Sequence, residues 1–194
     1  MGEIIYQNIY DASIAHNVYD RAKKFNLAAM TYTDELILTE DDHDEYVLIE
    51  SDINHMPIKH VDDFKKTVNF SVNKVLLTGK PDYVESILDD FKSPFKNTLS
   101  IYRSAPFFIE VMGKNIDKAT SLQRLIEYLG IKQEEVICFG DGYNDLTMIK
   151  FAGLGVAMEN SINDVKEYAD YVTLSNDEEG IYECLKMLSE KGEI

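Results

Sequence analysis

Asp141, Asn144 and Asp145 crowd into one short loop of this chain. The loop follows an apolar run at residues 136–139 and leads into an amphipathic segment at residues 143–151. This pattern is typical of a strand that delivers polar side chains to its carboxyl end, where open α/β sheets bind ligands. Two carboxylates and an amide suit a hard cation such as Mg²⁺ beside a phosphate. The alternative is that Asn144 or Asp145 only caps the following helix, because Gly-Asp-Gly turns are common there.

Lys118 is a second candidate for chemistry. It opens residues 118–129, whose apolar residues recur at helical spacing. A lysine in the first helical turn is electrostatically unfavourable, because the positive end of the helix dipole lies there. The position is explained if the lysine and the helix N-terminus bind the same anion, such as a phosphate. The alternative is a solvated lysine in a helix that Asp117 caps.

The loop belongs to a longer stretch with several further features. They are the Gly-Val-Ala-Met run at residues 155–158, Asn160, the Ala-Asp pair at residues 169–170 and the Asp-Glu-Glu-Gly run at residues 177–180. The stretch resembles the last signature of the haloacid dehalogenase (HAD) superfamily and, more narrowly, its Cof-type sugar-phosphatase branch. This resemblance implies an enzyme, a HAD-type phosphomonoester hydrolase. Such a Mg²⁺-dependent phosphatase hydrolyses small phosphorylated metabolites, such as sugar phosphates, through an aspartyl-phosphate.

The resemblance also implies a role for each candidate residue. Asp141 would be a direct Mg²⁺ ligand, and Asn144 would bind the substrate phosphate or touch the lysine. Asp145 would hold a metal-bound water or orient Lys118, and so counts as both metal-binding and catalytic. Lys118 would contact the phosphate and offset the charge of the acids, which makes it catalytic and substrate-binding.

One part of the family's machinery has no counterpart in this sequence. HAD phosphatases carry an aspartate nucleophile in an Asp-x-Asp-Gly-Thr loop after their first strand. Asp42-His43-Asp44 has the spacing, but Glu45-Tyr46 follows it. We therefore interpret the chain as truncated at its N-terminus and expect it to be inactive alone. The alternative is a non-catalytic binding or regulatory remnant of the HAD fold, and the coding sequence upstream would distinguish the two.

The pattern of apolar residues predicts an α/β fold that consists of three parts. Residues 12–104 are interpreted as an α/β cap domain, residues 105–194 as the C-terminal half of a doubly wound, Rossmann-like HAD core, and residues 1–11 as the remnant of a core hairpin. The expected strands are 3–10, 28–32, 36–39, 72–78, 98–103, 107–111, 136–139, 154–157 and 171–174, and the expected helices are 13–25, 82–91, 118–129, 143–151, 161–168 and 178–189.

The missing nucleophile strand has a consequence for the sheet. In the family fold it pairs with the strand expected at residues 136–139, so its absence would leave an open apolar edge. We expect a second copy of the chain in a homodimer, a separate N-terminal fragment, or rearranged local segments to cover this edge.

The composition of the chain limits the classes of partner that we expect it to bind. The 194 residues are 45% hydrophobic, which is enough for a packed core, and they carry a formal net charge of −16. Such a charge repels nucleic acid and anionic membranes, so we expect neither as a partner. No apolar run reaches the length of a membrane span. The two cysteines form no disulfide framework or Cys-x-x-Cys site, which favours a cytoplasmic location.

Overall fold

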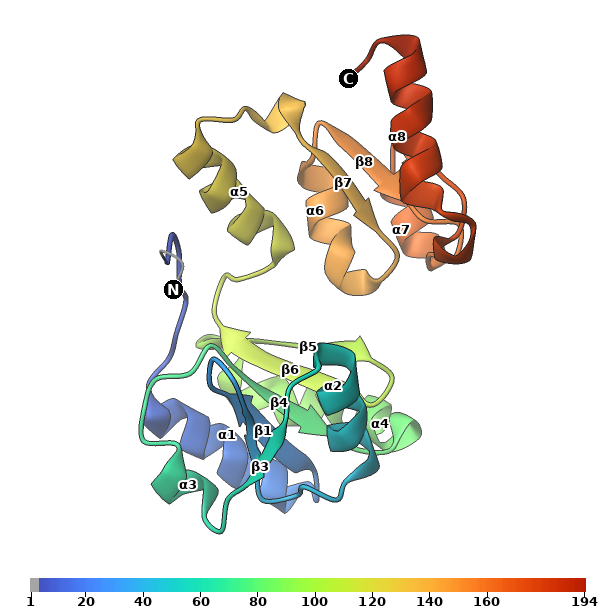
Figure 1. The fold of residues 1–194 in the computed structure, drawn as a ribbon. Helices are drawn as coiled ribbons and strands as arrows, with labels where there is room; N and C mark the ends of the chain where they lie inside the picture. The colour runs from blue at the N-terminus through green and yellow to red at the C-terminus, as the bar shows by residue number, and fades with distance from the viewer. Residues whose placement is uncertain (1–3) are drawn as a thin grey trace. The chain divides into compact units, whose positions relative to one another are not determined.

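The structure, a computed structural model, describes residues 4–194 and confirms the α/β fold (Figure 1). Contacts divide the described residues into two compact units: one comprises residues 7–116, and the other comprises residues 117–194 together with residues 4–6. Among residues 4–194, no helix is long and apolar enough to cross a bilayer.

The unit of residues 7–116 is built on a six-stranded sheet in the order β3-β2-β1-β4-β6-β5. All neighbouring strands are antiparallel except β2 and β3, which are parallel. The strands are β1 (Ala28–Tyr32), β2 (Ile37–Thr39), β3 (Ile58–His60), β4 (Lys74–Thr78), β5 (Leu99–Ala105) and β6 (Phe108–Gly113).

Helices cover both faces of this sheet. Alternate strand residues point to opposite faces, so Ala29 and Leu77 join one apolar cluster while Met30 and Leu76 join another. The first cluster includes residues of α1 (Ala12–Lys24), α3 (Phe64–Thr67) and α4 (Pro81–Lys92), and the second includes Val47 of α2 (Glu45–Asn54). A short 3-10 turn, Ser93–Phe95, follows α4.

Strand β6 lies in this unit, and this corrects the expected division. The sequence interpretation assigned residues 105–194 to the core, but β6 pairs with β4 on one side and β5 on the other. The contact boundary therefore falls between Ile116 and Asp117. Local sequence pattern predicted a strand here, but the partner of a strand is decided by the whole sheet.

Two other expectations were wrong. Residues 4–9 of the strand expected at 3–10 are in no strand, and only Tyr10 forms an isolated bridge, to Val72; residue 3 lies outside the described residues. Helix α2 was not expected at all. It begins after Asp44, whose carboxylate accepts hydrogen bonds from the N–H groups of Tyr46 and Val47, so the acidic run at residues 40–45 contains a helix cap as well as loop.

The second unit is built on a parallel sheet in the order β7-β8-β9. Residues of α5, α6 and α7 pack on one face of this sheet and residues of α8 on the other, as in a doubly wound fold. No described strand pairs with the outer edge of β7. The elements are α5 (Lys118–Leu129), β7 (Ile137–Gly140), α6 (Leu146–Phe151), β8 (Leu154–Ala157), α7 (Asn163–Tyr168), β9 (Tyr171–Val172) and α8 (Gly180–Lys191), with 3-10 turns at Gln133–Glu135, Tyr143–Asp145 and Asn176–Glu178.

Candidate active site

The loop after β7 holds the carboxylate of Asp145 through its own backbone. The 3-10 turn Tyr143–Asp145 folds the chain back, so that Asp145 Oδ2 accepts hydrogen bonds from the N–H groups of Asp141 (3.0 Å) and Gly142 (3.1 Å). Gly140 is needed at the strand end, because a Cβ there would lie only 2.4 Å from the Asp145 Cβ. The turn therefore fixes a buried carboxylate at the carboxyl end of β7.

Lys118 reaches this carboxylate from the first turn of α5. Asp117 caps the helix, as the sequence predicted, by accepting a 2.7 Å hydrogen bond from the N–H of Thr120. The Lys118 ammonium forms an ion pair with Asp145 Oδ1. The Asp145 side chain is 7% exposed and that of Lys118 is 47% exposed. The ammonium is thus anchored on its buried side and remains accessible to an anion from solvent.

The environment of Asp145 keeps it ionised. Burial raises the pKa of its carboxyl, but the hydrogen bonds from Lys118 and from the two backbone N–H groups more than offset this effect. The net result is a pKa below the ordinary value of 3.8. A charged Asp145 is therefore present at neutral pH to hold the Lys118 ammonium in position.

Asp141 differs from Asp145 because its side chain is exposed. Its Oδ2 accepts a 2.9 Å hydrogen bond from the Asn160 side-chain amide, and Asn160 Oδ1 accepts one from the N–H of Asn176 (3.1 Å). Ser161 donates a 3.1 Å hydrogen bond to the carbonyl of Gly140. The loop after β8 thus braces the loop after β7, because its side chains form hydrogen bonds to Asp141 and Gly140.

Sequence reasoning did not assign this bracing role to Asn160 or Ser161. The available signal was weak: a polar Asn-Ser pair three residues after an apolar strand that runs parallel to β7. Asn144 is partly exposed in the loop, and its side chain has no hydrogen bond to Lys118 in the described structure. The structure therefore brings Lys118, Asp141 and Asp145 together but does not link Asn144 to the lysine.

Among residues 4–194, the oxygen donors are not grouped into a magnesium site by themselves. Within residues 4–194, no three His, Cys, Asp or Glu side chains are grouped so that they could hold a metal ion. Asp145 Oδ2 accepts two backbone N–H groups, whereas Oδ1 contacts only the Lys118 ammonium. Asp145 can therefore orient Lys118, and its expected role as a metal ligand stays a prediction. Asp141 is the one loop carboxylate directed to solvent, and Mg²⁺ requires several oxygen ligands in an octahedron.

Comparison with known proteins places the chain in a family. The model of haloacid dehalogenase-like hydrolases matches residues 1–185. A 5-amino-6-(5-phospho-D-ribitylamino)uracil phosphatase, YitU of Bacillus subtilis (strain 168), is 34% identical over 146 residues, which cover 74% of this chain and 54% of the relative. The chain spans about half the length of the curated relatives it matches.

Solved structures show the same fold. A haloacid dehalogenase-like hydrolase from Bacteroides thetaiotaomicron is 39% identical with a TM-score of 0.88, over 96% of this chain and 70% of that one. A sugar phosphatase of HAD subclass IIB is 28% identical with a TM-score of 0.77, also over 96% and 70% of the two chains. These likenesses support the Cof-type branch that the sequence resembles. Because the family match agrees with the fold and with the site at the end of β7, the chain belongs to the haloacid dehalogenase-like hydrolase family.

Proposed function

We propose that this chain contributes to a Mg²⁺-dependent phosphatase of small phosphorylated metabolites, such as sugar phosphates, that works through an aspartyl-phosphate. The observation that carries this proposal is the Lys118–Asp145 ion pair at the carboxyl end of β7. A half-exposed ammonium held by a buried carboxylate is suited to binding a phosphate. Two similar proteins, a sugar phosphatase and a 5-amino-6-(5-phospho-D-ribitylamino)uracil phosphatase, support this substrate class.

Each residue of the site has a defined part in this proposal. Lys118 binds the substrate phosphate and neutralises charge that builds up on the transferring group. Asp145 positions Lys118, and Asn144 supplies an amide that can turn toward the phosphate. A bound Mg²⁺ would supply further positive charge at the phosphate, and Asp141 is the ligand that this chain would give it.

In this proposal, the nucleophile and the other metal ligands lie outside residues 4–194. We propose that a preceding N-terminal fragment carries them and pairs with the free outer edge of β7. A second copy of this chain could cover that edge but, having the same sequence, could not supply the Asp-x-Asp-Gly-Thr loop. Pairing would satisfy the open N–H and C=O groups of that edge. The chain alone is then expected to bind Mg²⁺ weakly and to show no turnover.

A non-catalytic role is the second candidate. It is favoured by the lack of a three-carboxylate metal cluster among residues 4–194. On this reading the fold would bind a phosphorylated ligand through Lys118 without hydrolysing it. The two candidates differ in whether the missing loop restores activity.

The deciding experiment is a phosphatase assay with p-nitrophenyl phosphate and Mg²⁺, with and without a supplied N-terminal fragment that carries an Asp-x-Asp-Gly-Thr loop. We expect activity only with the fragment, and its loss on chelation of the metal. In the complemented enzyme, Lys118→Met should lower kcat/KM by roughly a hundredfold or more, the scale of losing one charge-stabilising group. Lys132→Met, which changes an exposed lysine of the same unit, is the matched control.

Each outcome has a clear meaning. No activity in any mixture would overturn the enzymatic proposal in favour of the binding role. Activity without the fragment would show that a nucleophile lies within this chain. Equal activity in Lys118→Met and Lys132→Met would remove Lys118 from the site.

A further inference from the structure

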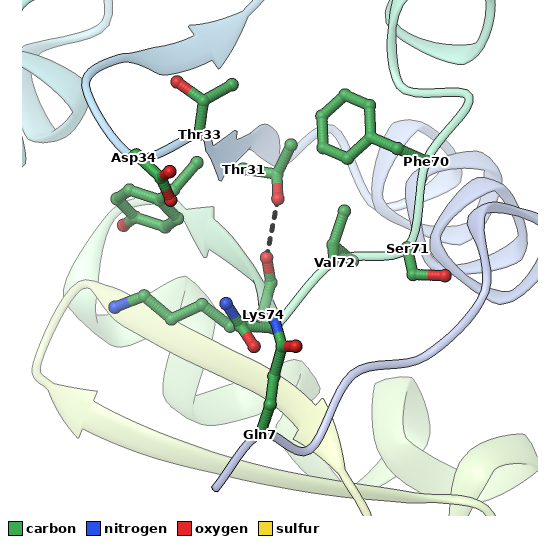
Figure 2. A pocket seen from close by; sticks show the side chains of 10 residues that line it. Gln7, Thr31, Thr33, Asp34, Phe70, Ser71, Val72 and Lys74 are labelled. Carbon is green, nitrogen blue, oxygen red and sulfur yellow. Dashed lines mark hydrogen bonds between the residues drawn. The ribbon is translucent and has the colours of Figure 1, made fainter. Parts of the chain in front are cut away.

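The unit of residues 7–116 contains a pocket of about 330 Å³ (Figure 2). It lies where the end of β1, the turn after it and the segment leading into β4 meet the N-terminal stretch at Gln7. Its volume is at the low end of the range of roughly 300–1,000 Å³ for small-molecule sites, so it suits a ligand of monosaccharide size. The lining residues are Gln7, Thr31, Tyr32, Thr33, Asp34, Phe70, Ser71, Val72, Asn73 and Lys74.

One wall of this pocket is fixed by internal bonds. The Thr31 hydroxyl donates a 2.7 Å hydrogen bond to the carbonyl of Lys74, drawn as the dashed line in Figure 2. The Lys74 ammonium lies 4.7 Å from the centre of the Tyr32 ring and 3.8 Å from Glu50 Oε1. The Tyr32 hydroxyl donates a 2.6 Å hydrogen bond to the same oxygen of Glu50, whose side chain is only 8% exposed. Lys74 is therefore held in place before any ligand arrives.

The hydroxyls of Thr33 and Ser71 also bond within the protein, but three other polar side chains of the pocket do not. Within the described residues, the side chains of Gln7, Asp34 and Asn73 have no hydrogen-bond partner, and all three residues are exposed. The side chain of Phe70 stands over the opposite side of the pocket and is 37% exposed. The pocket thus offers one carboxylate acceptor, two amides that both donate and accept, one ammonium donor and one apolar ring.

The charge of the pocket selects against anions. Glu50 cancels the charge of Lys74, and Asp34 adds a negative charge, in a chain whose formal net charge is −16. An anionic ligand would be repelled, whereas hydroxyl groups can donate to Asp34, accept from Lys74 and do both with the amides. The C–H groups of a sugar or polyol can pack on Phe70.

We propose that this pocket binds a neutral, polyhydroxylated molecule of the size of a monosaccharide or a linear sugar alcohol. Asp34, Asn73 and Gln7 form the hydrogen bonds at its mouth, and Lys74 forms those at the wall. The site lies wholly within residues 7–116 and requires no phosphate. It therefore stands independently of the proposed phosphatase function.

The test uses the full chain labelled with ¹⁵N, titrated separately with unphosphorylated D-glucose, D-mannose, ribitol and sorbitol, and with inorganic phosphate. At least one neutral compound should shift the backbone amide signals of residues 7, 33–34 and 70–74. Asp34→Ala and Asn73→Ala should each weaken that binding at least tenfold. Asp62→Ala changes a fully exposed aspartate of the same unit that does not line the pocket, and should bind like the parent chain.

Three results would overturn the proposal. They are the absence of pocket shifts with all four neutral compounds, larger pocket shifts with phosphate than with any of them, and unchanged binding in Asp34→Ala and Asn73→Ala. Both substituted side chains are exposed and unbonded, and the spectra of the variants report directly on whether they fold. No step depends on Lys118 or on hydrolysis, so failure here and failure of the phosphatase assay are separate findings.

Discussion

Asp145 in the C-terminal unit and Glu50 in the unit of residues 7–116 are both buried carboxylates beside a lysine, but they are held differently. Asp145 accepts two N–H groups from its own loop and pairs with Lys118 on its other oxygen. Glu50 is contacted by side chains, the hydroxyl of Tyr32 and the ammonium of Lys74, both at Oε1. One carboxylate is fixed by a backbone turn and the other by neighbouring strands of a sheet.

This difference bears on what each lysine can do. The turn holds Asp145 Oδ2 with two backbone N–H groups, and Lys118, which pairs with Oδ1, stays half exposed. Lys74 is 28% exposed and rests against the Tyr32 ring, so its charge is shared between a π face and Glu50. Lys118 is therefore the better candidate for a phosphate ligand, whereas Lys74 is suited to donate to a neutral group.

The largest predicted effect is that of Asp145→Asn on stability. An amide must turn its NH₂ group either toward Lys118 or toward the two backbone N–H groups, because donors lie on both oxygens of the native carboxylate. We expect a loss of about 2 kcal/mol in the free energy of unfolding of this unit, the scale of hydrogen bonds to a charged group. Urea unfolding followed by the NMR signals of residues 117–194 measures it, and a loss below about 0.5 kcal/mol would contradict the described geometry.

The second prediction concerns pH. The folded-state pKa of Asp145 is depressed below 3.8, so its stabilising contribution is present above that pH and is lost as the pH falls through the folded-state pKa. The difference in unfolding free energy between the parent chain and Asp145→Asn should therefore be constant near neutral pH and shrink below about pH 4. A difference that persists unchanged into this acid range would show that the contribution is not ionic.

A somewhat smaller effect is expected for Asp44→Ala in the other unit. Asp44 Oδ1 accepts from the N–H groups of Tyr46 and Val47 and from the hydroxyl of Thr78. Its loss should cost about 1–2 kcal/mol, as for other helix caps. Asp117→Ala, which removes a single 2.7 Å cap bond in α5, is the comparison and should cost about 1 kcal/mol. The reverse order would mean that the bond to Thr78 contributes nothing.

The smallest effect is predicted for Glu50→Gln. Because both contacts of Glu50 fall on Oε1, an amide can keep its oxygen there and turn its NH₂ group away. We expect a loss of less than about 1 kcal/mol, measured in the same urea experiment. A loss equal to that of Asp145→Asn would remove the contrast between the two carboxylates.

Much of the C-terminal unit could be predicted because its signals are local. Residues 118–129 and 154–157 match α5 and β8, since a capped amphipathic segment and a short apolar run between loops need no distant partner to be recognised. The cap at Asp117 was predicted for the same reason. The roles inferred for Asp141 and Lys118 as metal and phosphate ligands stay predictions.

The missed features all depend on contacts across the fold. Helix α2 has a weak apolar face, and it lies on the sheet through Val47. Strand β6 was recognised as a strand, but its place between β4 and β5 was not. Asn160 reaches Asp141 from a loop 19 residues away, which no spacing rule would reveal.

The sequence by itself determined the family, the α/β pattern and the identity of the polar residues after β7, because each of these can be recognised from a short run of neighbouring residues. Only the tertiary structure decided that Asp145 is buried and paired with Lys118 while Asp141 is exposed and bonded to Asn160. It alone also decided that β6 belongs with residues 7–116 and that a polar pocket forms around Lys74. The reason is physical: hydrogen-bond partners and burial are set by which segments meet, and residues such as Tyr32, Glu50 and Lys74 meet only when the sheet has formed.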